Sequence, residues 1–172
     1  NYISIEAEHF TALGDGAEGA HFEVLPEYGK TLSAVKAFPV INSYAKGKNA
    51  PYVEYKFALK ADGVMSLDFF LNPSNPAYKD NKLQFIAEVN GEKILKDVVD
   101  ENFHVGDNQE PWGTDVTNNI RISSVYADCK AGLNTLRVYP VTPNVVLEKI
   151  VIYNANTIMP DSYLGAPETY RK

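Results

Sequence analysis

Glu148 has an unusual position for a charged residue, because it lies within an apolar run near the end of the chain. Strand alternation places it in the same phase as Ile150 and Ile152, where side chains face a core. A buried carboxylate is costly unless cations or several hydrogen-bond donors surround it. We therefore expect Glu148 to have a specific partner inside the protein.

Two further carboxylates, Glu6 and Glu8, lie on the first predicted strand. The ends of a sandwich domain are often close together, so this strand is expected beside the last one. Three carboxylates in one place repel one another unless a hard cation joins them, and Ca²⁺ suits oxygen ligands, including backbone carbonyls from residues 31–33. The sequence thus predicts a structural calcium site formed by Glu6, Glu8 and Glu148. The alternative is that Glu148 pairs with Lys or Arg, or lies at an exposed strand end.

A second set of residues has the chemistry of a sugar site. Aromatic rings stack on the apolar face of a pyranose, while amides and carboxylates bind its hydroxyl groups. The candidate carbohydrate-binding residues are Trp112, Tyr78 and Tyr126, with Asn72 and Asn118 as amide partners.

Trp112 also has a structural explanation. It recurs with Val116 and Ile120 at helical spacing, which predicts one or two helical turns and favours a core plug over a sugar platform. Tyr78 lies in a polar loop, so we expect it to be the more exposed ring.

Residues for catalysis are few. His9, His21 and His104 show no metal-ligand spacing with one another or with Cys129. An acidic stretch over residues 97–110 contains enough carboxylates for a glycosidase pair, but such stretches are usually solvated surfaces. We therefore do not expect this chain to be an enzyme.

Composition limits the class of protein further. A chain of 172 residues with 45% hydrophobic residues predicts one domain over residues 1–172. The net charge of −6 argues against a nucleic-acid partner, and no apolar run is long enough for a membrane span. With Cys129 as the single cysteine no internal disulfide can form, which favours a bacterial source. The chain does not begin with Met, so it is expected to be processed or cut from a longer one.

The sequence pattern predicts short strands separated by turns, with hairpin turns at Asp62-Gly63 and Asn90-Gly91. Residues 13–19 are expected to form a loop. Strands are expected over residues 3–8, 22–25, 31–38, 52–59, 64–71, 83–89, 92–98, 122–127, 133–138 and 146–153. This pattern predicts an all-β sandwich or barrel.

Several short motifs together resemble two related groups of domains. Ile5-Glu-Ala-Glu, with an acidic residue at the start of the last strand, resembles the galactose-binding-like jelly rolls of carbohydrate-binding module families 6 and 35. Here Glu148 stands where those families usually have Asp. A closer resemblance is to the C-terminal β-sandwich domain of glycoside hydrolase family 115, the xylan α-1,2-glucuronidases. The matching motifs are Gly29-Lys-Thr-Leu-Ser-Ala-Val, Pro51-Tyr-Val-Glu-Tyr, Trp112 with Val116 and Asn119, Gly132-Leu-Asn-Thr-Leu, Val145-Val-Leu-Glu-Lys-Ile-Val-Ile and Ser162-Tyr-Leu-Gly-Ala-Pro-Glu.

The resemblance implies an accessory domain, because the catalytic carboxylates of family 115 belong to a separate upstream barrel. It implies a β-sandwich jelly roll, a structural calcium ion, and a secreted, periplasmic or cell-surface location in a bacterium. We expect a non-catalytic module that binds xylan or glucuronoxylan and holds the parent enzyme's catalytic domain near it. The alternative is a structural or interface domain that binds no glycan and docks through its tail, residues 160–168.

Overall fold

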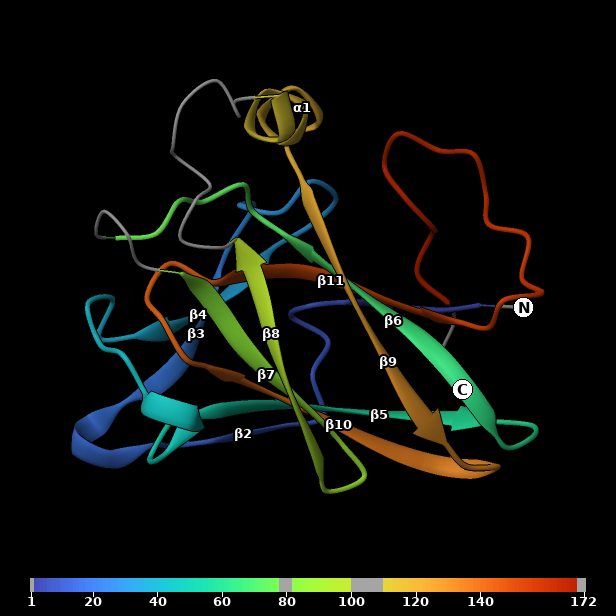
Figure 1. The fold of residues 1–172 in the computed structure, drawn as a ribbon, viewed down its shortest axis with the longest axis horizontal. Helices are drawn as coiled ribbons and strands as arrows, with labels where there is room; N and C mark the ends of the chain where they lie inside the picture. Colours follow the sequence, from blue (N-terminus) through green and yellow to red (C-terminus); the bar gives the residue numbers. More distant parts are fainter. Residues whose placement is uncertain (1, 78–81, 100–109, 170–172) are drawn as a thin grey trace.

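The computed structural model describes residues 2–77, 82–99 and 110–169, and most regular structure in these residues is strand (Figure 1). The strands are β1 (Ile3–Glu6), β2 (Ala12–Gly14), β3 (His21–Leu25), β4 (Ala34–Phe38), β5 (Tyr52–Leu59), β6 (Gly63–Leu71), β7 (Leu83–Val89), β8 (Glu92–Val99), β9 (Arg121–Cys129), β10 (Gly132–Pro140) and β11 (Val146–Tyr153). The helical segments are α1 (Glu110–Asn118) and the 3₁₀ turns η1 (Ala17–Gly19) and η2 (Ala45–Gly47). None of the helices among these residues is long and apolar enough to cross a membrane.

The strands form two antiparallel sheets. One sheet has the order β3-β4-β11-β6-β9, with β1 also paired to β11. The other has the order β2-β5-β10-β7-β8. The predicted pairing of the first and last strands is confirmed, and so is the all-β sandwich.

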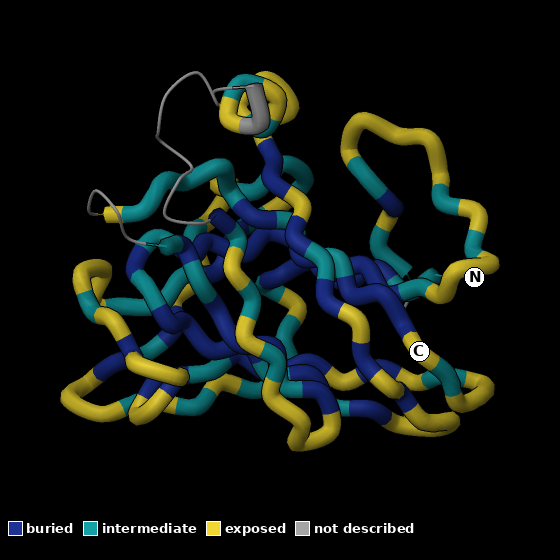
Figure 2. The backbone as a smooth tube through the Cα atoms, viewed as in Figure 1, coloured by how far each residue is buried: buried dark blue, intermediate teal, exposed yellow. Residues whose placement is uncertain are grey.

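The core lies between the two sheets, as the buried stretches of the tube show (Figure 2). In β6, Leu67, Phe69 and Leu71 alternate inward, as expected for a strand with one face on a core. The ring centroid of Phe69 lies 4.8 Å from that of Phe85 in β7, across the two sheets. Cys129 is buried in the same core, where it packs as a small apolar residue.

Several predicted boundaries differ from the structure, and the strand predicted over residues 3–8 ends at Glu6, so that Glu8 lies in the turn that follows. Residues 12–14 form a short strand on β5 rather than the start of a loop, and Gly14 is needed there because a Cβ atom would overlap the ring of Tyr52. A three-residue strand is too short to show periodicity. The strand predicted over residues 31–38 begins only at Ala34, because residues 30–33 direct their polar groups at carboxylates instead of a neighbouring strand.

β4 and β1 lie one after the other along the same edge of β11. β4 pairs with Val146 and Leu147, whereas β1 pairs from Lys149 onward. Glu148 lies at the junction, and the β11–β6 register shifts at this residue, which is the geometry of a β-bulge. The junction leaves a gap in the strand pairing that other groups must fill.

The tail, residues 154–169, leaves β11 as an exposed loop and then returns to β1 (Figures 1 and 2). The Ser4 hydroxyl donates a hydrogen bond to the carbonyl of Ala166 over 2.9 Å. The backbone N–H of Glu6 donates to the Glu168 carboxylate, and that of Thr169 donates to the Ser4 carbonyl. The tail is therefore an ordered part of the fold that covers β1 and part of β11.

Candidate functional site

The three glutamates predicted to bind calcium all contact one loop at the β4–β1 junction. A carboxylate oxygen of Glu148 accepts the backbone N–H of Lys30 over 2.7 Å, and one of Glu8 accepts that of Ser33 over 3.1 Å. Both oxygens of Glu6 accept the hydroxyl of Thr31, at 2.8 and 2.7 Å. The loop reaches the carboxylates through N–H and hydroxyl donors. The sequence thus identified the right loop but not the groups that it uses.

Glu6 has a partner that the sequence did not suggest. The Lys149 ammonium lies 3.0 Å from a Glu6 oxygen, and both side chains are almost fully buried, at 4% and 5% exposure. The same ammonium contacts the carbonyls of Leu164 and Ala166. Alternation predicts an exposed Lys149, but the tail covers this face of β11 and buries it.

Glu148 and Glu8 retain free acceptor capacity. Glu148 is 2% exposed, and burial raises the pKa of its carboxyl despite the opposing effects of the Lys30 N–H and the nearby Asn72 amide. Glu148 Oε1 and Glu8 Oε2 are buried without a hydrogen-bond partner. Such oxygens suit a hard cation. However, within residues 2–77, 82–99 and 110–169 no three acidic, His or Cys side chains are grouped closely enough to form a metal site. The two unpartnered oxygens of Glu8 and Glu148 are therefore the only support for a cation among these groups, since Glu6 is already paired with Lys149.

A second feature is the tail groove, a hollow of about 360 Å³ between the tail and the outer face of β6 and β9. Its volume lies within the range of small-molecule sites. The groove is lined by Lys30, Asp68, Phe70, Asn118, Ile120, Ile122, Met159, Pro160, Ser162, Tyr163, Gly165 and Ala166. Most of these side chains are apolar or aromatic, with a few polar groups between them.

Hydrogen bonds hold the polar groups of the groove in place. Asp68 accepts the hydroxyls of Ser124 and Tyr153 over 2.7 and 2.9 Å. The Lys30 ammonium donates to the carbonyl of Asn118 over 2.8 Å and lies 3.6 Å from the centre of the Tyr163 ring. Burial lowers the pKa of Lys30. A preformed carboxylate, an ammonium and a tyrosine ring therefore border one apolar hollow.

One of the predicted sugar-binding residues lines this groove, and a second lies farther along the same face of β9. Asn118, the last residue of α1, lines it directly. Tyr126 extends it along β9, because Ile122, Ser124 and Tyr126 share the outer face of that strand and Tyr126 is 70% exposed. Tyr163, which also lines the groove, was missed, although the aromatic residue in the patterned tail was a signal available in the sequence.

The other predicted residues lie elsewhere. The predicted helical turns are present as α1, but Trp112 is 41% exposed, so the prediction that it is a core plug is wrong. Val116 is 44% exposed as well, whereas Ile120 is buried. The reason is that α1 lies at the end of the sandwich (Figure 1), held by the ion pair between Arg121 and Asp115 at 2.6 Å. Asn72 lies beside Glu148 rather than in the groove. Tyr78 lies outside the described residues.

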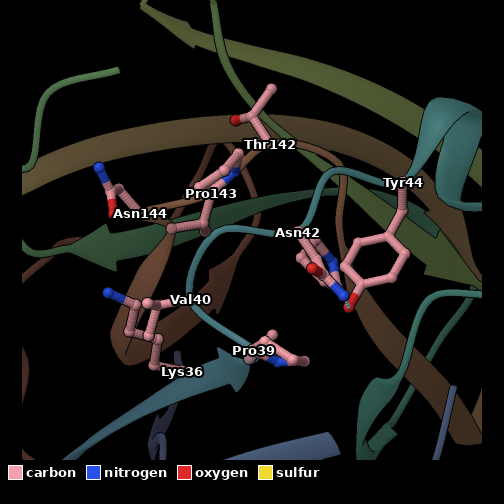
Figure 3. Close-up of a pocket in the computed structure, with 11 residues that line it drawn as sticks. Lys36, Pro39, Val40, Asn42, Tyr44, Thr142, Pro143 and Asn144 are labelled. Atoms are coloured by element: carbon pink, nitrogen blue, oxygen red, sulfur yellow. Dashed lines mark hydrogen bonds between the residues drawn. The ribbon is translucent and has the colours of Figure 1, made fainter. Parts of the chain in front are cut away.

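A smaller hollow between the β4–β5 and β10–β11 connections is too tight for a sugar (Figure 3). Lys36, Pro39, Asn42, Thr142 and Asn144 are among its lining residues. Its free volume is about 10 Å³, which is about the space of one water molecule. The tail groove therefore remains the better candidate.

Two antiparallel sheets around one core, with a groove on an outer face, define a β-sandwich jelly roll. The chain belongs to the glycosyl hydrolase family 115 C-terminal domain family, whose model matches residues 1–168. No curated protein sequence matches the chain significantly.

Solved structures share the fold at low sequence identity. A family GH115 4-O-methyl-α-glucuronidase with specificity for decorated arabinogalactans has a TM-score of 0.59 and 18% identity, over 86% of this chain and 18% of that one. An exo-β-1,3-galactanase from Phanerochaete chrysosporium has a TM-score of 0.56 and 16% identity, over 89% of this chain and 29% of that one. A family 35 carbohydrate-binding module from Clostridium thermocellum has a TM-score of 0.59 and 13% identity, over 90% and 99%. The chain thus spans about a fifth of the glucuronidase and nearly all of the binding module.

Proposed function

We propose that this chain is a non-catalytic module that binds a plant cell-wall polysaccharide, xylan or glucuronoxylan, through the tail groove and Tyr126. The observation that carries the proposal is the exposed Tyr126 ring next to the ordered Asp68 and Ser124 hydroxyl–carboxylate pair. The ring offers a stacking face, and the polar pair offers hydrogen bonds to sugar hydroxyls. Family membership supports a link to a hydrolase.

The module would act as an anchor outside a bacterial cell. Linking it to a catalytic domain raises the effective concentration of that domain at the polymer, without any catalytic residue in the module. The hydrolase is therefore the expected covalent partner. Arabinogalactan and β-1,3-galactan are the competing polymers, since two structural relatives have names that refer to such substrates.

Affinity electrophoresis tests the proposal. The isolated chain is run in gels containing xylan, glucuronoxylan, arabinogalactan, β-1,3-galactan or β-glucan. Retardation by xylan or glucuronoxylan is the expected result. Retardation by the galactans alone would overturn the choice of polymer, and free migration in all five gels would overturn the binding function.

The groups around Glu148 favour a structural calcium ion as part of the same proposal. Glu8 Oε2 and Glu148 Oε1 would supply ligands, and the ion would join the β4–β1 junction to β11. A ligand that binds only the folded state adds about 2.7 kcal/mol at a concentration 100 times its Kd. We expect millimolar Ca²⁺ to raise the melting temperature, and Glu8→Gln or Glu148→Gln to remove the effect. An equal rise in melting temperature with Ca²⁺ in the wild type and in both variants would contradict the proposed calcium site.

A second candidate function is an interface with a catalytic domain. Ile158, Tyr163 and Leu164 of the tail are exposed, with Ile158 at 93%. Exposed apolar residues in a group often mark an interaction surface. In a parent hydrolase, Ile158→Asp would then lower the thermal stability or activity of the enzyme. Unchanged glycan binding by the same variant would separate this role from the first.

A further inference from the structure

A third hollow lies at the end of the sandwich where the β5–β6 turn meets the end of β11. Its volume is about 470 Å³, which is within the range of small-molecule sites. We call it the end hollow. It is lined by Tyr2, Ile3, residues 58–62, Met65, residues 152–154 and Asn156. None of the residues predicted from the sequence to bind sugar or calcium lines it.

The floor of the end hollow is apolar. Met65 and Ile152 belong to the main core, and Ile3 packs against that core. The rings of Tyr2 and Tyr153 contribute to the walls. An apolar floor with tyrosine walls suits a ligand that has an extensive C–H surface.

The rim of the end hollow is polar. Lys60 and Asp62 are exposed there, and Asp62 is held by the Lys130 ammonium at 3.2 Å and by the backbone N–H of Ala131. Asn154 and Asn156 lie in one turn, in which the Asn154 carboxamide oxygen accepts the backbone N–H of Asn156 over 3.1 Å. This orients the Asn154 side chain and leaves its NH₂ group to donate to a ligand.

Tyr153 connects the end hollow to the tail groove. It lines the end hollow, and its hydroxyl donates to Asp68, which lines the groove. Tyr126 on β9 is paired with Ser66 on β6, which in turn is paired with Tyr153 on β11. A ligand that leaves the groove along Tyr126 therefore meets Tyr153 next.

We propose that the end hollow is a second glycan subsite that binds a neutral pyranose residue and continues the binding path of the tail groove. An apolar face bordered by amides and other polar groups suits such a sugar. The inference rests on the proposed function in one respect, namely that the ligand is a polysaccharide. Two subsites on one path make affinity increase with the length of the oligosaccharide.

The test is amide chemical-shift mapping of the chain during titration with neutral xylo-oligosaccharides and β-1,3-galacto-oligosaccharides of increasing length. We expect shifts at Ala61 and Asn156 as well as at Tyr126. Ala61→Trp should fill the hollow, remove the shifts there and lower the affinity for the longest oligosaccharide about tenfold. Asn156→Ala should weaken binding in the same direction, and circular dichroism should show that both variants are folded.

The outcomes separate the two proposals. Shifts at Tyr126 but not at Asn156 for every oligosaccharide would overturn the end hollow and leave the tail groove. Shifts at Asn156 alone would support the end hollow and overturn the groove as a sugar site. Wild-type affinity in Ala61→Trp would also overturn the end hollow as a subsite. The absence of chemical-shift changes at both Tyr126 and Asn156 would overturn both proposals.

Discussion

Two consecutive charged side chains, Glu148 and Lys149, are buried in the middle of an apolar strand. The bulge at Glu148 allows this, because it interrupts the β11–β6 register and turns the carboxylate towards the loop at residues 30–33. Lys149 is compensated by Glu6 and by carbonyls of the tail. Removing one member of such a pair leaves an uncompensated charge, which is the costly case.

We expect Lys149→Met to lower the free energy of unfolding by about 3–5 kcal/mol, because it leaves Glu6 buried without its cation. The double variant Glu6→Gln with Lys149→Met should recover part of that loss. Urea denaturation of the two variants and the wild type measures both values. Equal stability of Lys149→Met and the wild type would show that the buried pair makes no net contribution.

Glu148 should make the metal-free protein pH-dependent. Burial raises the pKa of its carboxyl in the folded state, so the folded state binds the proton more tightly than the unfolded state. The contribution of Glu148 to stability is therefore complete below its unfolded pKa and is lost as the pH rises through the higher folded value. Glu148→Gln should reduce this loss, so that without calcium the variant is the more stable protein at neutral pH. If the free energy of unfolding had the same pH dependence in the wild type and in Glu148→Gln, Glu148 would not be the source of that dependence.

Among the elements, the tail has the largest effect on the proposed site. It forms one wall of the groove, and it buries Lys149. At Gly165, φ is +80° and a Cβ atom would lie 3.0 Å from the ring of Phe70. Glycine is therefore required both for the backbone conformation and for the close approach of the tail to β6.

Gly165→Ala should lower the free energy of unfolding by about 1–2 kcal/mol from the backbone conformation alone. The contact with Phe70 should also loosen the tail. A matched control is Gly91→Ala, where φ is +91° but nothing lies within 4 Å of the added Cβ atom. Amide hydrogen exchange in residues 159–169 should become faster in Gly165→Ala and not in Gly91→Ala. Equal exchange in the two variants would show that the Phe70 contact does not hold the tail.

Features that depend on neighbouring residues could be predicted from the sequence, whereas features that depend on contacts between distant segments could not. Alternation in β6 and the Asn90-Gly91 turn depend on neighbouring residues, so these features could be predicted. The burial of Lys149 depends on the tail, and the exposure of Trp112 depends on where α1 lies relative to the sheets. Such contacts between distant segments leave no local pattern.

The candidate site shows the same limit. Glu148 could be singled out because a carboxylate in a core phase conflicts with its surroundings, and its burial is confirmed. Tyr126 and Asn118 could be named from residue type alone. The position of Asn118 in the tail groove, and of Tyr126 on the same face of β9, could not, since the groove forms where the tail, with Tyr163, lies against β6 and β9.

In the whole molecule, the residues that stabilise the sandwich are largely different from the residues proposed to bind a glycan. The core between the sheets and the buried Glu6–Lys149 pair hold the fold together. The tail groove and the end hollow lie on its outer surface, joined by Tyr153. Substitutions of exposed residues in the hollows should therefore change glycan binding without unfolding the chain.

The central claim is that Tyr126 provides the stacking surface for a cell-wall polysaccharide. The most direct measurement is affinity electrophoresis in glucuronoxylan of the wild type, Tyr126→Ala and the control Tyr28→Ala, which removes another exposed tyrosine that lies outside the groove. We predict that Tyr126→Ala lowers the affinity about tenfold, as expected for loss of one stacked ring, while Tyr28→Ala behaves as the wild type. Equal retardation of Tyr126→Ala and the wild type would contradict the account.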